Sequence, residues 1–152
     1  MNVLIPIDGS DQALQTIAMA GKFLNRQISL IYLLTVKPPM EAFPWCTLED
    51  VLQTQRDLER AKFRADIAGL KVQNTAHVFF DSPSFAICNY ANRIKANLIV
   101  IGTHGYQGFA KFLIGSVTRQ VLEKSTQPVI MVRNDKSNAV RINNLENASL
   151  AL

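Results

Sequence analysis

Hydrophobic positions along the chain alternate between short continuous apolar runs and stretches in which apolar side chains recur every three to four residues. Continuous runs are typical of buried parallel strands, and the longer period is typical of amphipathic helices. Four stretches predict helices that begin near Ser10, Thr47, Pro83 and Ser116. Five apolar runs predict strands, at residues 2–7, 28–36, 76–80, 98–101 and 128–132. This alternation predicts an α/β protein.

The order of these elements also predicts how the sheet is built. Right-handed crossovers leave few topologies, and we expect a single open five-stranded parallel sheet with helices on both faces, flavodoxin- or Rossmann-like, with strand order 3-2-1-4-5. Ligands of such sheets bind at the carboxyl ends of the strands, where the strand order reverses. Asp8 ends the first strand and Gly102 ends the fourth, so we expect both residues at one crevice.

Length and charge narrow the class of protein. Residues 1–133 carry the α/β pattern and are expected to form one domain, whereas residues 134–152 are expected to be a tail that is disordered or docks on a partner subunit. No apolar run approaches the roughly 18 residues of a membrane span, and the first residues lack the basic flank of a signal peptide. A cytoplasmic protein with no membrane partner is therefore expected. The net charge of +4 is dispersed, and the densest basic stretch, residues 56–64, is interleaved with acids, so nucleic acid is not expected as a partner.

Phosphate-binding chemistry is indicated where the fourth apolar run ends. The run Gly102-Thr103-His104-Gly105 follows directly, and nine residues later comes Gly115-Ser116-Val117-Thr118. Glycine leaves the backbone amides unobstructed, and a helix that begins at Ser116 offers free N–H groups and a positive dipole end to an anion. Ser116 and Thr118 add hydroxyl donors. The run lacks the Lys-Ser/Thr pair of a Walker A loop and the G-x-G-x-x-G spacing of dinucleotide folds.

The spacing Gly102-x2-Gly105-x9-Gly115-Ser116 resembles the nucleotide motif of the ATP-binding branch of the universal stress proteins. The opening strand that ends in Pro6-Ile7-Asp8-Gly9-Ser10 and the closing strand at residues 127–133 also resemble that family, so the resemblance covers about residues 1 to 133. It implies a stress-response regulatory protein that binds ATP, with or without magnesium, and signals through a homodimer. The dimer is implied to form through antiparallel pairing of the last strand, Pro128 to Val132, at the edge of the sheet.

The resemblance also implies roles for individual residues. The aspartate that matches Asp8 lies at the ribose, Gly102 and Gly105 match residues that line the ribose and phosphates, and the run Gly115-Ser116-Val117 matches the residues that hold the phosphate chain. The adenine is implied to meet backbone groups near Leu34, at the end of the second strand. The complete set of expected nucleotide-binding residues is Pro6, Ile7, Asp8, Ser10, Leu34, Gly102, Thr103, His104, Gly105, Gly115, Ser116, Val117 and Thr118.

Each expected site residue also has a purely structural interpretation. Asp8 before Gly9-Ser10 is common turn chemistry ahead of a helix. Gly102 and Gly105 are compatible with a tight turn that needs positive φ, and His104 is best interpreted as a hydrogen-bonded loop histidine, because no Cys or carboxylate lies at metal-ligand spacing from it.

Other functions share this type of sheet. A phosphorylated receiver domain would use Asp8 and Asp81, but the acidic pair after the first strand is missing. An ATP pyrophosphatase would carry Ser-Gly-Gly-x-Asp-Ser where Asp8-Gly9-Ser10-Asp11 stands. Within the family, a nucleotide-free dimeric scaffold and a weak ATPase stay open. No general base and no acidic magnesium ligand beyond Asp8 are evident, so we expect binding rather than turnover and assign no catalytic residue and no metal site formed by the protein alone.

Overall fold

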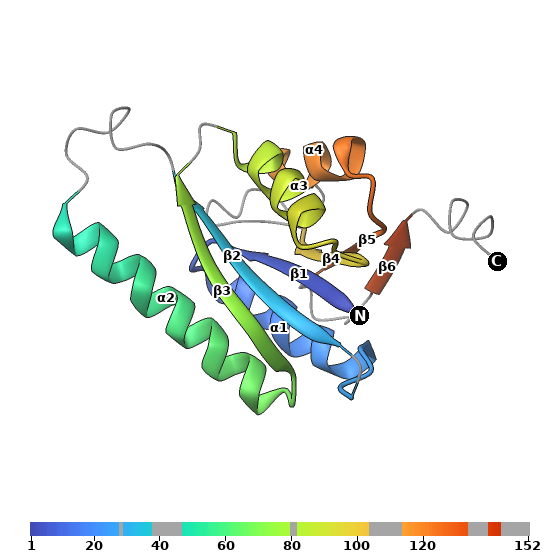
Figure 1. The fold of residues 1–152 in the computed structure, drawn as a ribbon, viewed down its shortest axis with the longest axis horizontal. Helices are drawn as coiled ribbons and strands as arrows, with labels where there is room; N and C mark the ends of the chain where they lie inside the picture. The colour runs from blue at the N-terminus through green and yellow to red at the C-terminus, as the bar shows by residue number, and fades with distance from the viewer. Residues whose placement is uncertain (28, 38–46, 80–81, 104–113, 134–139, 144–152) are drawn as a thin grey trace.

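The computed structural model describes residues 1–27, 29–37, 47–79, 82–103, 114–133 and 140–143. They form one open sheet with helices on both of its faces (Figure 1). The helices are α1 (Asp11–Phe23), α2 (Leu48–Ile67), α3 (Pro83–Arg93) and α4 (Ser116–Lys124). The strands are β1 (Asn2–Ile7), β2 (Leu30–Lys37), β3 (Lys71–Phe79), β4 (Leu98–Gly102), β5 (Val129–Val132) and β6 (Val140–Asn143).

The sheet has the strand order β3-β2-β1-β4-β5-β6. Its first five strands are parallel, which confirms the predicted α/β fold and the order 3-2-1-4-5. Strand β1 pairs with β2 on one side, with Ile7 opposite Thr35, and with β4 on the other, with Val3 opposite Leu98. The strand order therefore reverses between β1 and β4, and the carboxyl ends of these two strands are neighbours.

Strand β6 is an element that the hydrophobic pattern does not predict. It pairs antiparallel with β5, so that Val132 lies opposite Val140 and Val129 lies opposite Asn143. The expected tail thus contributes four residues to the sheet, because the outer edge of β5 finds its hydrogen-bond partners within the same chain. The remaining residues of that tail, 134–139 and 144–152, lie outside the part of the chain that the structure describes.

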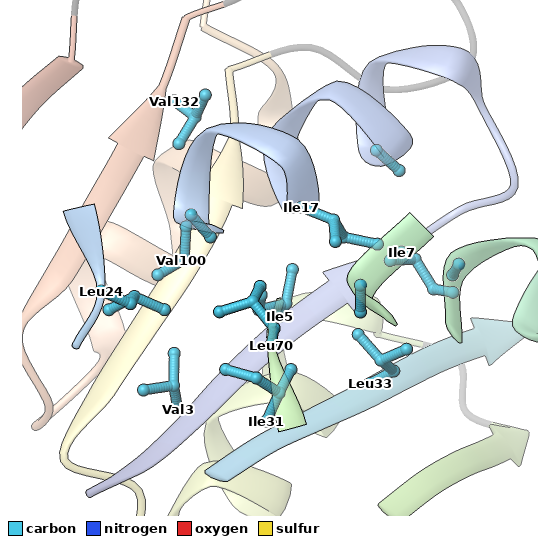
Figure 2. Packing of buried hydrophobic residues seen from close by; sticks show 14 of the residues in the cluster. Val3, Ile5, Ile7, Ile17, Leu24, Ile31, Leu33, Leu70, Val100 and Val132 are labelled. Carbon is cyan, nitrogen blue, oxygen red and sulfur yellow. The ribbon is translucent and has the colours of Figure 1, made fainter. Parts of the chain in front are cut away.

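Two apolar clusters fill the space between the sheet and its helices. On one face the strands pack against α1 and α2, and on the other against α3 and α4, so the expectation of helices on both faces is confirmed. Neighbouring strand residues alternate between the two clusters, as Leu33 and Leu34 do, which explains why the strands read as continuous apolar runs. Figure 2 shows part of the α1/α2 cluster, with labelled side chains Val3, Ile5, Ile7, Ile17, Leu24, Ile31, Leu33, Leu70, Val100 and Val132.

Helices α1 and α2 approach each other closely on their shared face. A Cβ added at Gly21 of α1 would lie 2.7 Å from the Cβ of Ala68 and 2.8 Å from its carbonyl oxygen. Glycine at this position therefore lets the end of α2 rest directly on the backbone of α1. The contact joins the C-terminal ends of the two helices and fixes α2 alongside α1 on this face of the sheet.

Candidate functional site

The turn after β1 holds Asp8 through its own neighbours. One carboxylate oxygen of Asp8, Oδ1, accepts from the backbone N–H of Ser10 at 3.0 Å and from the Ser10 hydroxyl at 2.6 Å. The Ser10 oxygen in turn accepts from the N–H of Ala13 at 3.2 Å and caps α1. Gly9, between them, has φ +86°, a conformation that L side chains rarely adopt. The turn chemistry expected for Asp8 is therefore present, and it fixes a half-buried carboxylate at the end of the first strand.

The turn after β4 brings the start of α4 back against that strand. The N–H of Gly115 donates to the carbonyl of Thr103 at 2.8 Å, and the Thr118 hydroxyl donates to the carbonyl of Gly102 at 2.8 Å. The N–H of Thr103 donates to Val132 of β5 at 3.0 Å, so this strand end is also tied to the sheet. The predicted strand end at Gly102 and helix start at Ser116 are therefore present, whereas the rest of the glycine turn, from residue 104, lies outside the described residues.

The first turn of α4 has the features of an anion site. Gly115 is the N-cap residue and offers no side-chain acceptor, and the turn contains no acidic residue. The first hydrogen bond of the helix runs from Arg119 N–H to Gly115 at 3.0 Å, so the N–H groups of residues 116–118 have no acceptor within the helix. Their positive partial charges, at the positive end of the helix dipole, favour a negatively charged group.

The conformation of Gly115 separates the functional from the structural interpretation of that glycine. Its φ is −58°, which any residue can adopt, and the described glycines with positive φ are Gly9 and Gly69. A tight turn therefore does not require glycine at residue 115. What glycine provides there is an absent Cβ next to the free amides of the helix start, which is the property a phosphate site needs.

The remaining expected residues fall into three groups. Thr118 is buried and its hydroxyl donates to the carbonyl of Gly102, whereas Ser116 is exposed and Val117 is half-buried. Pro6 and Ile7 lie in β1, and Leu34 pairs with Pro6, with its side chain fully buried against α3 and α4. The carboxyl end of β2 is formed by residues 35–37, which lie beyond Leu34 toward the expected crevice. An adenine contact at Leu34 itself therefore stays a prediction. His104 and Gly105, with the segment 106–113 and the proline-rich residues 38–46, lie outside the described residues.

One residue at this edge of the sheet was missed by sequence reasoning. Asp57 lies on α2, where alternating charges predict a solvated face. In the structure its side chain is 9% exposed and lies against Gly9. The signal that could have found it is its helical spacing, because Asp57 shares the buried stripe of α2 with Thr54, Ala61 and Ala65.

Across the described ranges, no group of three or more His, Cys, Asp or Glu side chains is placed to hold a metal ion. Among the helices of those ranges, none combines the length and the apolar character that crossing a membrane requires.

Comparison with known proteins identifies the family. The profile of the universal stress protein family matches residues 1–133. The universal stress protein MJ0531 of Methanocaldococcus jannaschii is 31% identical over 143 residues, which cover 88% of this chain and 82% of that protein. A universal stress protein of Thermus aquaticus is 30% identical over 137 residues, which cover 86% of this chain and 97% of that protein.

Solved structures show the same fold. Protein MJ0577 of Methanocaldococcus jannaschii superposes with a TM-score of 0.73 at 24% identity, with 89% of this chain and 96% of that chain covered. A universal stress protein in complex with cAMP superposes with a TM-score of 0.67 at 27% identity, with 89% of this chain and 98% of that chain covered. From the family profile and these relatives, the chain belongs to the universal stress protein family.

Proposed function

We propose that this protein is a regulatory module of the stress response that binds an adenine nucleotide, with ATP as the ligand, between the carboxyl ends of β1 and β4. The observation that carries the proposal is the uncapped start of α4, held against β4 by the bond from Gly115 N–H to Thr103. The structure with 27% identity that contains cAMP supports an adenine nucleotide as the ligand class.

The site suggests how the nucleotide lies. The phosphates accept from the amides at residues 116–118, where no Cβ of residue 115 obstructs them. The ribose lies toward Asp8 at the end of the neighbouring strand β1, and the carboxylate of Asp8 accepts from the ribose hydroxyls. Glycine 105 and His104 belong to the same proposed site, and the adenine lies toward the end of β2, beyond Leu34. Magnesium is proposed only as a companion of the triphosphate, with Asp8 as the available carboxylate.

Isothermal titration with ATP, AMP and cAMP, each with and without magnesium, tests this function. Replacement of Gly115 by valine places a branched side chain over the amides, and we expect it to weaken nucleotide binding by about tenfold or more, the loss of at least one charge-assisted hydrogen bond. The backbone at residue 115 accepts valine, so the circular dichroism spectrum should be unchanged.

Ser116→Ala is the matched control for this experiment. It removes an exposed hydroxyl but keeps the backbone amide, so it should retain most of the affinity. A wild-type protein that binds none of the three nucleotides and releases none on denaturation would refute the proposed function. A Gly115→Val variant that binds as tightly as the wild type would refute the assigned phosphate position.

The proposed homodimer pairs through β5, but the expectation that this strand lies at the edge of the sheet is wrong, because β6 occupies that edge. In the structure this strand is flanked by β4 and by β6, so its backbone groups are already paired on both sides. A second copy therefore reaches residues 129–132 only when β6 moves away. This competition between β6 and a second copy provides a simple way to regulate dimer formation.

A further inference from the structure

Helix α2 buries one carboxylate on the face that packs against the rest of the protein. Asp57 is 8% exposed, while most charged residues of this helix are exposed. Aspartate is rarely buried to this extent unless its carboxylate has partners. The position of Asp57 therefore calls for a specific role.

The carboxylate of Asp57 occupies the space above Gly9. A Cβ added at Gly9 would lie 2.8 Å from Cγ of Asp57 and closer still to Oδ2. Gly9 also has φ +86°, so both the backbone conformation and the close approach require glycine. The turn between β1 and α1 and the side chain of Asp57 are thus fitted to each other.

Neighbouring side chains hold Asp57 in this position. Its Oδ1 accepts from Nε2 of Gln53 at 3.0 Å and lies 3.9 Å from a guanidinium nitrogen of Arg60. Another nitrogen of Arg60 lies 3.3 Å from the carboxylate of Asp11, the first residue of α1. Helix α2 therefore contacts the β1–α1 turn on both sides of Ser10. The Arg60 side chain is half exposed, so its ion pairs add little, and the packing of Asp57 on Gly9 is the main contact.

We propose that Asp57 is a positioning residue for Asp8, and that it sets the preference of the site for nucleotides that carry ribose hydroxyls. Gly9 separates Asp8 from Ser10, whose hydroxyl holds the Asp8 carboxylate at 2.6 Å. A change in the conformation of Gly9 therefore turns Asp8 away from its present direction. This inference rests on the proposed nucleotide-binding function.

Titration with AMP and with 2′,3′-dideoxy-AMP tests the proposal. The wild type should bind AMP about tenfold more tightly than 2′,3′-dideoxy-AMP, because a hydrogen bond to a charged group contributes about that factor to the affinity. Asp57→Ala should lose most of that ratio, because its affinity for AMP falls about tenfold while its affinity for the dideoxy compound changes less than about threefold. Asp57→Asn, which keeps the shape and an acceptor for Gln53, should retain most of the ratio.

Asp66→Ala is the control, because it removes an exposed acid from the same helix. An AMP to dideoxy-AMP ratio that is the same in Asp57→Ala and in the wild type overturns the proposal. Where Asp57→Ala does not fold, Asp57→Ser, which keeps a short polar side chain, carries the same expectation.

Hydrogen exchange of the ligand-free protein separates this inference from the proposed function. The amides of residues 9–11 should exchange faster in Asp57→Ala than in the wild type, and those at the start of α4 should not. Unchanged exchange at residues 9–11 overturns the positioning role whether or not nucleotide binds. Faster exchange in a protein that binds no nucleotide confirms the contact but refutes the nucleotide-binding function on which the inference rests.

Discussion

The packing of Asp57 on Gly9 predicts a strong energetic coupling between the two residues. Alanine at residue 9 must adopt φ near +86°, which costs about 1–2 kcal/mol for an L residue. Its Cβ also overlaps the carboxylate of Asp57, and because that side chain is 9% exposed and has little room to turn away, relief of the overlap costs about 1–3 kcal/mol more. Gly9→Ala should therefore lower the free energy of unfolding by about 2–5 kcal/mol.

A double-mutant cycle separates these two costs. In the Asp57→Ala background the overlap is gone, so adding Gly9→Ala should cost only the backbone term of about 1–2 kcal/mol. The loss in the double variant should be smaller than the sum of the two single losses by about 1–3 kcal/mol. Urea unfolding followed by circular dichroism at 222 nm measures all four proteins.

Gly69→Ala provides the control for the backbone term. Gly69 has φ +71°, but its added Cβ would meet the flexible side chain of Arg26, at 3.1–3.3 Å. It should lose about 1–2 kcal/mol and show no coupling to Asp57→Ala. Losses for Gly9→Ala and Asp57→Ala that add to within about 0.5 kcal/mol would refute the reasoning, because two residues in direct contact must couple.

Three other predictions follow from single features of the structure. Deletion of residues 134–152 removes β6 and leaves the outer edge of β5 unpaired. Light scattering after gel filtration should then show a larger dimer fraction for the shortened chain than for the full chain. An unchanged dimer fraction would contradict dimer formation through β5. Burial, with a smaller contribution from Lys37, lowers the pKa of His77 below its usual 6.5. The unfolded chain therefore binds more protons than the folded one, and the free energy of unfolding should fall as the pH drops from 7 to 5. Urea unfolding of His77→Gln should show a smaller fall over the same range. Burial raises the pKa of the Cys88 thiol above its usual 9.0, against a smaller opposite effect of Lys124. In a Cys46→Ser background, Ellman's reagent at pH 8 should therefore react several-fold more slowly with the folded chain than with the urea-unfolded chain. Equal rates would contradict the burial of Cys88.

The interior strands were predictable because both of their faces are buried. Strands β1 and β4 pack against helices on each side, so almost every residue is apolar and the run begins and ends clearly. Strand β3 is an edge strand, and Lys71, Gln73, Asn74 and Thr75 in its first half are exposed. Its apolar run predicts a start at residue 76, five residues late, because pairing with β2 rather than side-chain burial defines its beginning.

Local chemistry explains which parts of the candidate site were predictable. The strand end at Gly102 and the helix start at Ser116 follow from neighbours in sequence, and the bond from Gly115 N–H to Thr103 then holds the helix start against the strand. The contact between Asp57 and Gly9 joins residues far apart in sequence and depends on where α2 crosses α1. Strand β6 depends in the same way on an edge that exists only after β5 has joined the sheet.

The two glycines at this edge of the sheet allow binding and folding to be tested separately. Gly9 requires glycine for reasons within the protein, since its φ is +86° and Asp57 fills the space of a side chain. Gly115 has φ −58° and starts a helix without a side-chain cap, so its backbone tolerates other residues, and its proposed role is toward the ligand. Substitution at residue 9 should therefore lower stability in the absence of nucleotide, whereas substitution at residue 115 should leave the stability of the ligand-free protein within about 1 kcal/mol of the wild type. The added stability that nucleotide gives the wild type, which grows as RT ln(1 + [L]/Kd), should be lost in Gly115→Val, and its survival there would place the phosphates elsewhere.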